Sequence, residues 1–240
     1  GTLGSLGHWS TDHVRVDGAL SVPPSPQRRP VLVQAGGSPG GLALAARYAD
    51  VVFTVGQTLG DAVTFRETTK QRAASAGRDP GQVAISLGVV VLVAASEAEA
   101  RARLEELVNT SDPDAAAFGV AAQLGLDPTH ITPDTVLTPE VLDAAARPPG
   151  SAGFHRSIRA LLAERPLTVR DLFTRSASGS GHRLLVGTPE QIADDLQQWH
   201  AAGAAEGFTI MSADTAVDFE RFTESVVPIL QRRGLFRPGY

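Results

Sequence analysis

The segment PVLVQAGGSPGGLALAARYADVVFTV, residues 30–55, contains the pattern that decides the fold. An apolar run stops at a loop that holds four glycines, one serine and one proline, and an alanine-rich stretch follows. Leu42, Ala45, Ala46 and Ala49 recur at helical spacing, and DVVFTV is a second apolar run. The segment therefore predicts a strand, a tight loop, a helix and a second strand.

The remaining strands extend this βαβ pattern. Non-alternating apolar strands between helices predict a parallel α/β sheet that is covered on both faces. An eight-stranded α/β barrel uses about 250 residues, close to the length of this chain, but only part of the strand set is present. The barrel-type strands are Val31–Ala35, Val51–Thr54, the run around Leu87–Val93, and Phe208–Met211. We therefore predict half of a TIM-like (β/α)8 barrel, one partial domain over residues 1–240, with a helical and loop insertion at 96–183.

Local signals predict further elements. Thr188 to Gln191 combine a helix cap, a proline at the first helical position and a glutamine at the third. Helices are also expected over residues 61–76 and 218–233. The alternation in residues 13–22 predicts a short hairpin that turns at Asp17–Gly18.

Composition excludes several classes of function. The net charge of −5 argues against binding to nucleic acid or to anionic membranes. The absence of cysteine excludes disulfides, thiolate metal sites and a cysteine nucleophile. No apolar run approaches the length of a bilayer span, and GTLGSLGHWSTDH lacks the regions of a signal peptide. We expect a soluble, cytoplasmic protein without nucleic-acid or membrane partners.

The glycine loop suggests a phosphate site. The amides of Gly36, Gly37 and Ser38 and the Ser38 hydroxyl are donors, and the helix that begins near Gly40 adds its positive end. The loop matches neither the P-loop, because no Gly-Lys-Ser/Thr follows, nor the dinucleotide fingerprint, because the next strand does not end in an acidic residue. A βα turn whose glycines serve packing alone is the open alternative.

Two other chemistries match less well. The loop formally contains G-x-S-x-G, but Pro39 lacks the backbone N–H that the oxyanion hole of a hydrolase would use. His8, Asp12 and His13 resemble metal ligands without a fourth ligand or helical spacing, so no metal site is expected. Arg183 either attracts an anionic substrate or is solvated, and we favour solvation.

Four blocks of sequence together resemble one family. They are Val31–Gly41 with Ala45–Thr54, then Gly181–Met211, Val226–Phe236, and the leading segment VDGALSVPPSPQRRP. They resemble the bacterial luciferase-like flavin monooxygenases, in the branch that contains nitrilotriacetate, alkanesulfonate-type and dibenzothiophene-sulfone monooxygenases. The resemblance extends over nearly the whole chain in order, and it implies the C-terminal half of the barrel, strands five to eight.

The resemblance implies a cofactor and a site. Members use reduced FMN and O₂ on small organic substrates, and a separate flavin reductase supplies the reduced FMN. The phosphate contact falls on Ser38, with the backbone of Gly36 and Gly37. Many relatives have a second hydroxyl where this chain has Gly37. Its absence removes one hydrogen bond to the charged phosphate, which contributes about 1.5–3 kcal/mol. The loop that contains His182 lies over the active-site mouth in the family, so His182 is a candidate proton donor.

Three functions follow for this chain. The leading hypothesis is an FMN-dependent monooxygenase whose truncated chain is inactive alone. The second is a non-catalytic truncated barrel that acts only as an assembly partner. The third is hydride transfer with a deazaflavin. Half-barrels expose sheet edges and apolar surface, so we expect a homo-oligomer.

Overall fold

The computed structural model describes residues 7–18, 23, 25–145, 150–175 and 181–239. The chain divides into two compact units, Gly1–Leu32 and Val33–Tyr240. The smaller unit contains an antiparallel hairpin of β1 (Gly7–Ser10) and β2 (Arg15–Gly18). The predicted turn at Asp17–Gly18 is wrong: these residues end β2, and the turn forms where Val14 donates its N–H to Thr11 Oγ1 at 3.1 Å.

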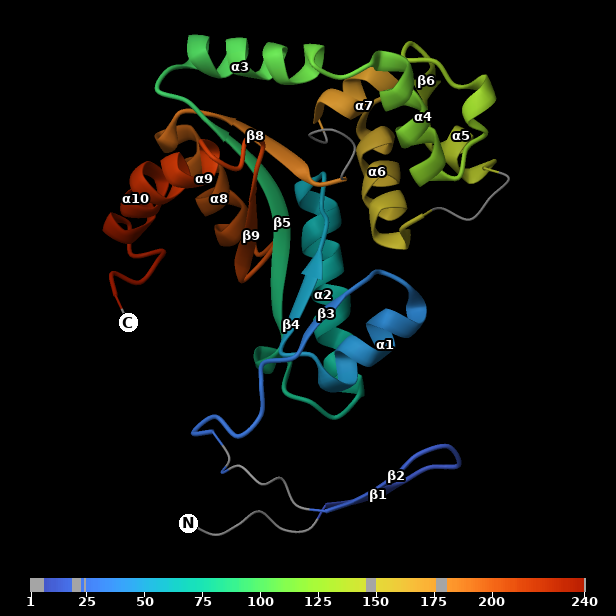
Figure 1. Ribbon diagram of the computed structural model, residues 1–240, viewed down its shortest axis with the longest axis vertical. Helices are drawn as coiled ribbons and strands as arrows, with labels where there is room; N and C mark the ends of the chain where they lie inside the picture. Colours follow the sequence, from blue (N-terminus) through green and yellow to red (C-terminus); the bar gives the residue numbers. More distant parts are fainter. Residues whose placement is uncertain (1–6, 19–22, 24, 146–149, 176–180, 240) are drawn as a thin grey trace. The chain divides into compact units, whose positions relative to one another are not determined.

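The larger unit is built on a five-stranded parallel sheet (Figure 1). Its strands are β3 (Val33–Ala35), β4 (Val51–Thr54), β5 (Ala84–Val93), β8 (Arg183–Gly187) and β9 (Gly207–Ser212). The predicted α/β class with a parallel sheet is confirmed. β8 was not predicted, because its sequence RLLVG is short and begins with a charged residue.

β5 organises this sheet. Val89 pairs with Arg183 of β8 and also with Ile210 of β9, and Leu87 pairs with both β4 and β9. Because a strand has only two edges, β9 occupies one edge of β5, and β4 and β8 follow each other along the opposite edge. Gly88 lies where β4 ends and β8 begins.

Helices connect the strands and fill the segment between β5 and β8. Those outside that segment are α1 (Pro39–Tyr48), α2 (Leu59–Ser75), η1 (Pro80–Gln82), α8 (Pro189–Ala201), α9 (Asp218–Arg221), the π-helix η3 (Phe222–Val226) and α10 (Val227–Arg232). The predicted capping box of α8 is confirmed, with Thr188 and Gln191 capping each other's backbone. The predicted continuous last helix is interrupted by η3, because Pro228 has no N–H and its ring crowds the carbonyl four residues earlier.

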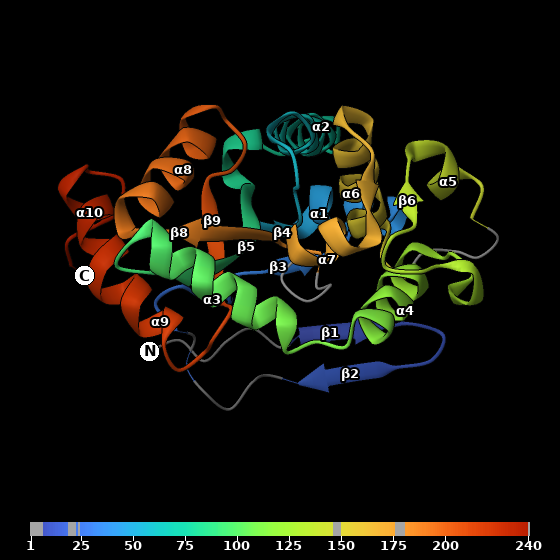
Figure 2. The ribbon, with the colours of Figure 1, turned by 90° about the horizontal axis from the view of Figure 1, so that it is seen from above.

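One face of the sheet is covered by helices. Alternate residues of β5 from Ile85 to Val93 are buried on this side against α1, α2, α8 and α10. Figure 2 shows α2 and α8 on the same side of the strands. This face holds two adjacent hydrophobic clusters, and their burial is the main stabilising term of the sheet.

The segment between β5 and β8 forms a helical region with its own core. Its elements are α3 (Glu97–Asn109), α4 (Pro113–Leu124), η2 (Pro128–His130), β6 (Val136–Leu137), α5 (Pro139–Asp143), α6 (Ala152–Glu164), β7 (Leu167–Thr168) and α7 (Val169–Arg175). Leu124, Ile158 and Leu172 are fully buried in a cluster whose members all come from this segment. The loop expected at SASGSGHR lies largely outside the described residues, since residues 176–180 are not described.

Candidate functional site

The glycine loop joins the end of β3 to the start of α1. Gly36 has φ of +133°, a region that favours glycine. Ser38 is the N-cap of α1, and its Oγ accepts a hydrogen bond from the Gly41 N–H at 3.1 Å. The backbone of Ser38 is extended and unstrained, with φ −70° and ψ 154°, unlike the strained serine of a hydrolase elbow.

A second helix begins against the same loop. A Cβ placed on Gly37 would lie 2.9 Å from Gly153 Cα and 3.0 Å from Gly153 N, which is closer than side chains approach backbone. Gly153 is in the first turn of α6, whose N-cap Ser151 accepts from the Phe154 N–H. Gly37 is therefore a glycine because α6 packs on it, and a hydroxyl side chain does not fit there unless α6 moves.

A cavity of about 480 Å³ lies between these two helix starts. Its lining comes from the ends of β3 and β4, the glycine loop, the end of α4, the start of α6 and the turn before β8. The residues are Ala35, Gly36, Gly37, Phe53, Thr54, Val55, Gln123, Gly150, Ser151, Gly153, Phe154 and His182. None of them is acidic, and the first amides of a helix lack intrahelical acceptors. The cavity is therefore suited to an anionic group.

The structure brings His182 to this cavity together with Gly36 and Gly37, whereas Ser38 does not line it. The imidazole lies over Gly88, and a methyl group on Gly88 would overlap Nδ1. The ring centroid is 5.6 Å from that of Phe53. Burial lowers the pKa of His182, and the backbone of Gly88 only partly opposes this. The imidazole is therefore neutral at pH 7.

Nδ1 of His182 is buried and makes no hydrogen bond of acceptable geometry to any described residue. An unpaired buried nitrogen costs free energy unless a ligand or water bonds to it. His182 therefore combines a place in the cavity lining with a buried nitrogen that has no partner among the described residues.

Gln57 and Arg156 support this cavity, and sequence analysis identified neither. Gln57 Nε2 donates to the Gly181 carbonyl at 3.1 Å, and the Gln57 N–H donates to Ser157 Oγ at 2.7 Å. The loop after β4 thus holds both α6 and the turn that carries His182. Arg156 Nη2 donates to the Val55 carbonyl at 2.9 Å. These partners are at least 100 residues apart in the chain, so no local sequence signal reveals them.

The other candidate residues have structural partners. Arg183 is not solvated as expected: it forms a bidentate ion pair with Asp195 at 2.7 and 2.6 Å and stacks 3.8 Å above the Trp199 ring. His8 is hydrogen-bonded to Asp17 in the small unit. Within the described residues, no group of three or more His, Cys, Asp or Glu side chains is arranged to hold a metal ion.

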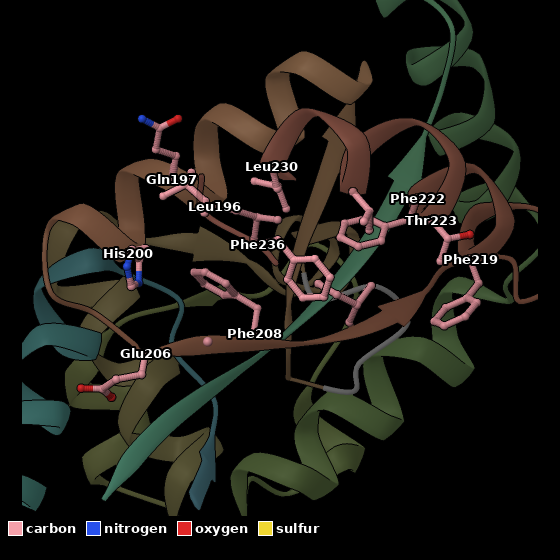
Figure 3. Close-up of a pocket in the computed structure, with 14 residues that line it drawn as sticks. Leu196, Gln197, His200, Glu206, Phe208, Phe219, Phe222, Thr223, Leu230 and Phe236 are labelled. Carbon is pink, nitrogen blue, oxygen red and sulfur yellow. The ribbon is translucent and has the colours of Figure 1, made fainter. Parts of the chain in front are cut away.

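A second cavity, of about 500 Å³, lies along β9 between α8 and the last helices (Figure 3). Phe208, Phe222 and Phe236 make its lining largely apolar. Glu206 at its rim already binds the Ile85 N–H, Lys70 and Arg66. Burial favours the neutral acid, but these three donors together lower the pKa of Glu206. The groove therefore offers apolar contact, and its carboxylate is already engaged.

Residues 4–206 match the family model described as luciferase-like monooxygenase. The chain belongs to this family, as its sequence motifs predict. It is 43% identical to nitrilotriacetate monooxygenase component A from Aminobacter aminovorans, over 95% of this chain and 50% of the relative. It is 33% identical to dibenzothiophene-sulfone monooxygenase from Rhodococcus erythropolis, over 98% of this chain and 51% of the relative. The predicted branch of the family is confirmed.

A solved structure agrees with this assignment. EDTA monooxygenase from Chelativorans sp. BNC1 superposes with a TM-score of 0.72 at 31% identity, covering 98% of this chain and 54% of that one. The chain thus spans about half the length of the relatives it matches, which agrees with the predicted partial barrel. Among the described residues, no helix is both long and apolar enough to cross a membrane.

Proposed function

We propose that this chain is part of a flavin monooxygenase that uses reduced FMN and O₂ on a small organic substrate. The observation on which the proposal rests is the cavity in which the glycine loop, the start of α6 and His182 meet without a carboxylate. Membership of the luciferase-like monooxygenase family supports flavin as the ligand class. Ligand cavities of about 300–1,000 Å³ are typical, and this one lies within that range.

The cavity residues fit the phosphate end of FMN. Gly36 and Gly37 line the cavity and none of its lining residues is acidic. Ser38 follows them in the loop just outside the lining, and its hydroxyl hydrogen stays free to donate while Oγ accepts from Gly41. Reduced flavin supplies the two electrons with which one oxygen atom of O₂ enters the substrate and the other leaves as water. The chain's own contribution is to bind the phosphate, orient the ligand and exclude water.

His182 has a separate role in this proposal. Because its imidazole is neutral at pH 7, it acts as a neutral hydrogen-bond donor or acceptor at the cavity wall rather than as a cation. Its buried Nδ1, which has no partner among the described residues, is the atom we assign to ligand or substrate contact. Because His182 lines the cavity, proton transfer by its imidazole is part of this proposal.

We further propose the partners and the organisation of the protein. A separate flavin reductase supplies reduced FMN in the cytoplasm; the name of one relative, component A, is that of one part of a multicomponent system. Residues 96–183 are an insertion within a single partial barrel. Because the chain spans half the length of its relatives, we expect it to be inactive alone and to self-associate through its exposed apolar surface.

The test is a titration of the chain with oxidised and then reduced FMN, for wild type, Ser38→Ala and Ser96→Ala. Both serines are helix N-caps, so both variants lose about 0.5–2 kcal/mol of stability. Only Ser38→Ala is expected to weaken FMN binding, by about 10-fold. A wild-type chain that unfolds cooperatively yet shows no saturable binding would contradict the proposed function.

A further inference from the structure

Gln57 lies in the loop between β4 and α2, and its backbone is held on both sides. Its own N–H donates to Ser157 Oγ of α6 at 2.7 Å. The next residue, Thr58, is the N-cap of α2, where its side chain accepts from the Asp61 N–H at 3.2 Å. Gln57 and Ser157 are buried, with 9% and 0% of their surface exposed. The side chain of Gln57 therefore starts from a backbone position that the fold determines closely.

The side-chain amide of Gln57 holds the peptide that leads into His182. Its Nε2 donates to the Gly181 carbonyl at 3.1 Å. A peptide unit is planar, so the Gly181 oxygen and the Cα of His182 belong to one rigid group. A hydrogen bond that fixes this oxygen therefore also fixes the atom from which the imidazole side chain departs.

Gly181 contributes little to this orientation by itself. Its φ is +79°, a conformation that glycine adopts readily and other residues rarely. A Cβ at this position would overlap the Phe154 ring of α6. The turn thus requires a glycine, and a glycine leaves the direction of the next residue to be set by contacts. The hydrogen bond from Gln57 supplies that direction.

The imidazole of His182 is packed closely once the turn is held. A Cβ on Gly88 would lie 2.7 Å from its Cε1, and its ring centroid is 5.6 Å from that of Phe53. Among the described residues that line the cavity, His182 is the only titratable one. Arg183, the next residue in the chain, is paired with Asp195. The solvation of the His182 ring therefore depends on how the turn is held more than on a nearby charge.

We propose that Gln57 is a positioning residue for His182: by holding the Gly181 carbonyl, it keeps the imidazole at the cavity wall in the orientation that contacts the ligand. This inference rests on the proposed function and deepens it, because it names a residue outside the cavity lining on which the His182 contact depends. Since Gln57 is also bonded to α6, it links the insertion to the turn before β8.

The first experiment follows His182 by NMR in the full chain without any ligand. The imidazole signals of histidine-labelled wild type, Gln57→Met and Ser157→Ala are titrated with pH, and His182→Asn identifies the resonance. Burial lowers the pKa of His182 in the wild type. Gln57→Met has a side chain of similar length without a donor, so we expect water to reach the ring and the pKa to rise toward about 6.5. Ser157→Ala is the matched control, since it removes the other hydrogen bond of Gln57 and leaves the bond to Gly181.

Each outcome of this titration decides the inference. A His182 pKa that rises in Gln57→Met and stays at the wild-type value in Ser157→Ala supports it. An unchanged pKa in Gln57→Met overturns it. Equal rises in both variants also overturn it, because they indicate a general loosening of the loop after β4.

A double-mutant cycle connects this positioning to ligand binding. Reduced FMN is titrated into wild type, Gln57→Met, His182→Asn and the double variant. We expect Gln57→Met to weaken binding about 3- to 10-fold when His182 is present, and to have no further effect when it is absent. Losses that add overturn the inference, since Gln57 then acts independently of His182. A wild type that binds no FMN overturns the proposed function, and the ligand-free titration then still decides whether Gln57 positions His182.

A second variant covers the case in which Gln57→Met does not fold. Gln57→Asn keeps the amide but is one methylene shorter, so it cannot reach the Gly181 carbonyl while its backbone N–H stays bonded to Ser157. We expect the pKa of His182 to rise in this variant as well. A wild-type value in a folded Gln57→Asn chain would contradict positioning by the side-chain amide.

Discussion

The two faces of the parallel sheet differ in what covers them. On one face, which we call the covered face, Val52, Ile85, Leu87, Val89 and Val91 are nearly inaccessible beneath helices. On the other, the open face, the strand register aligns Val33, Val51, Phe53, Ser86 and Thr209. Val33 is 64% exposed, and the Ser86 and Thr209 hydroxyls bond to each other at 2.8 Å in solvent.

This difference separates stability from ligand binding. Parallel sheets are normally covered on both faces, and in closed α/β barrels the inner face is filled by side chains from all eight strands. Here the open face holds the apolar residues Val33, Val51 and Phe53 beside the polar pair Ser86 and Thr209, and the cavity with His182 lies where β3 and β4 end on this side. Active sites of α/β barrels lie at this end of the strands. The covered face buries the apolar core, and the open face carries the candidate site.

The largest expected effect is on the covered face. Ile85→Ala removes a side chain with no exposed surface and leaves a cavity, which costs about 2–5 kcal/mol. The neighbouring change Ser86→Ala, on the open face, is expected to cost at most about 0.5–1 kcal/mol, the worth of one exposed hydrogen bond. Urea unfolding of the two variants measures the difference. Similar costs at both positions would remove the distinction between the faces.

Gly88 tests how tightly the open face is packed beneath His182. In Gly88→Ala the new methyl group overlaps His182 Nδ1 and lies 3.0 Å from the Phe53 ring, so we expect a loss of about 1–3 kcal/mol. Gly119→Ala is the control, because Gly119 lies in α4 with open space around its Cβ position. It is expected to gain about 0.5–1 kcal/mol. Thermal unfolding checks both, and equal shifts would show that His182 moves aside freely.

The sequence predicts the βαβ order because the relevant signals are local. Strand composition, the glycine loop and the caps of α1 and α8 all act within a few residues. Strand β8 was missed because the charge of Arg183 is compensated by Asp195 and Trp199, which lie farther along the chain. The contacts that support the cavity are likewise non-local. Gln57 Nε2 donates to the Gly181 carbonyl, which lies 124 residues farther along the chain. Sequence thus named Gly36, Gly37 and His182 but not what brings them together.

The smallest expected effect on stability comes from the exposed edge of the open face. Val33→Ser removes an apolar side chain that solvent already reaches, so its stability should change by no more than about 0.5 kcal/mol. If the open face mediates self-association, however, the same change lowers the apparent mass in sedimentation experiments over a concentration series. Leu44→Ser is the matched control: Leu44 is 53% exposed, but it lies on helix α1 instead of the sheet. Equal effects of the two variants would attribute self-association to general surface hydrophobicity. An effect of Val33→Ser alone would show that the protein buries the open face of the sheet when it self-associates.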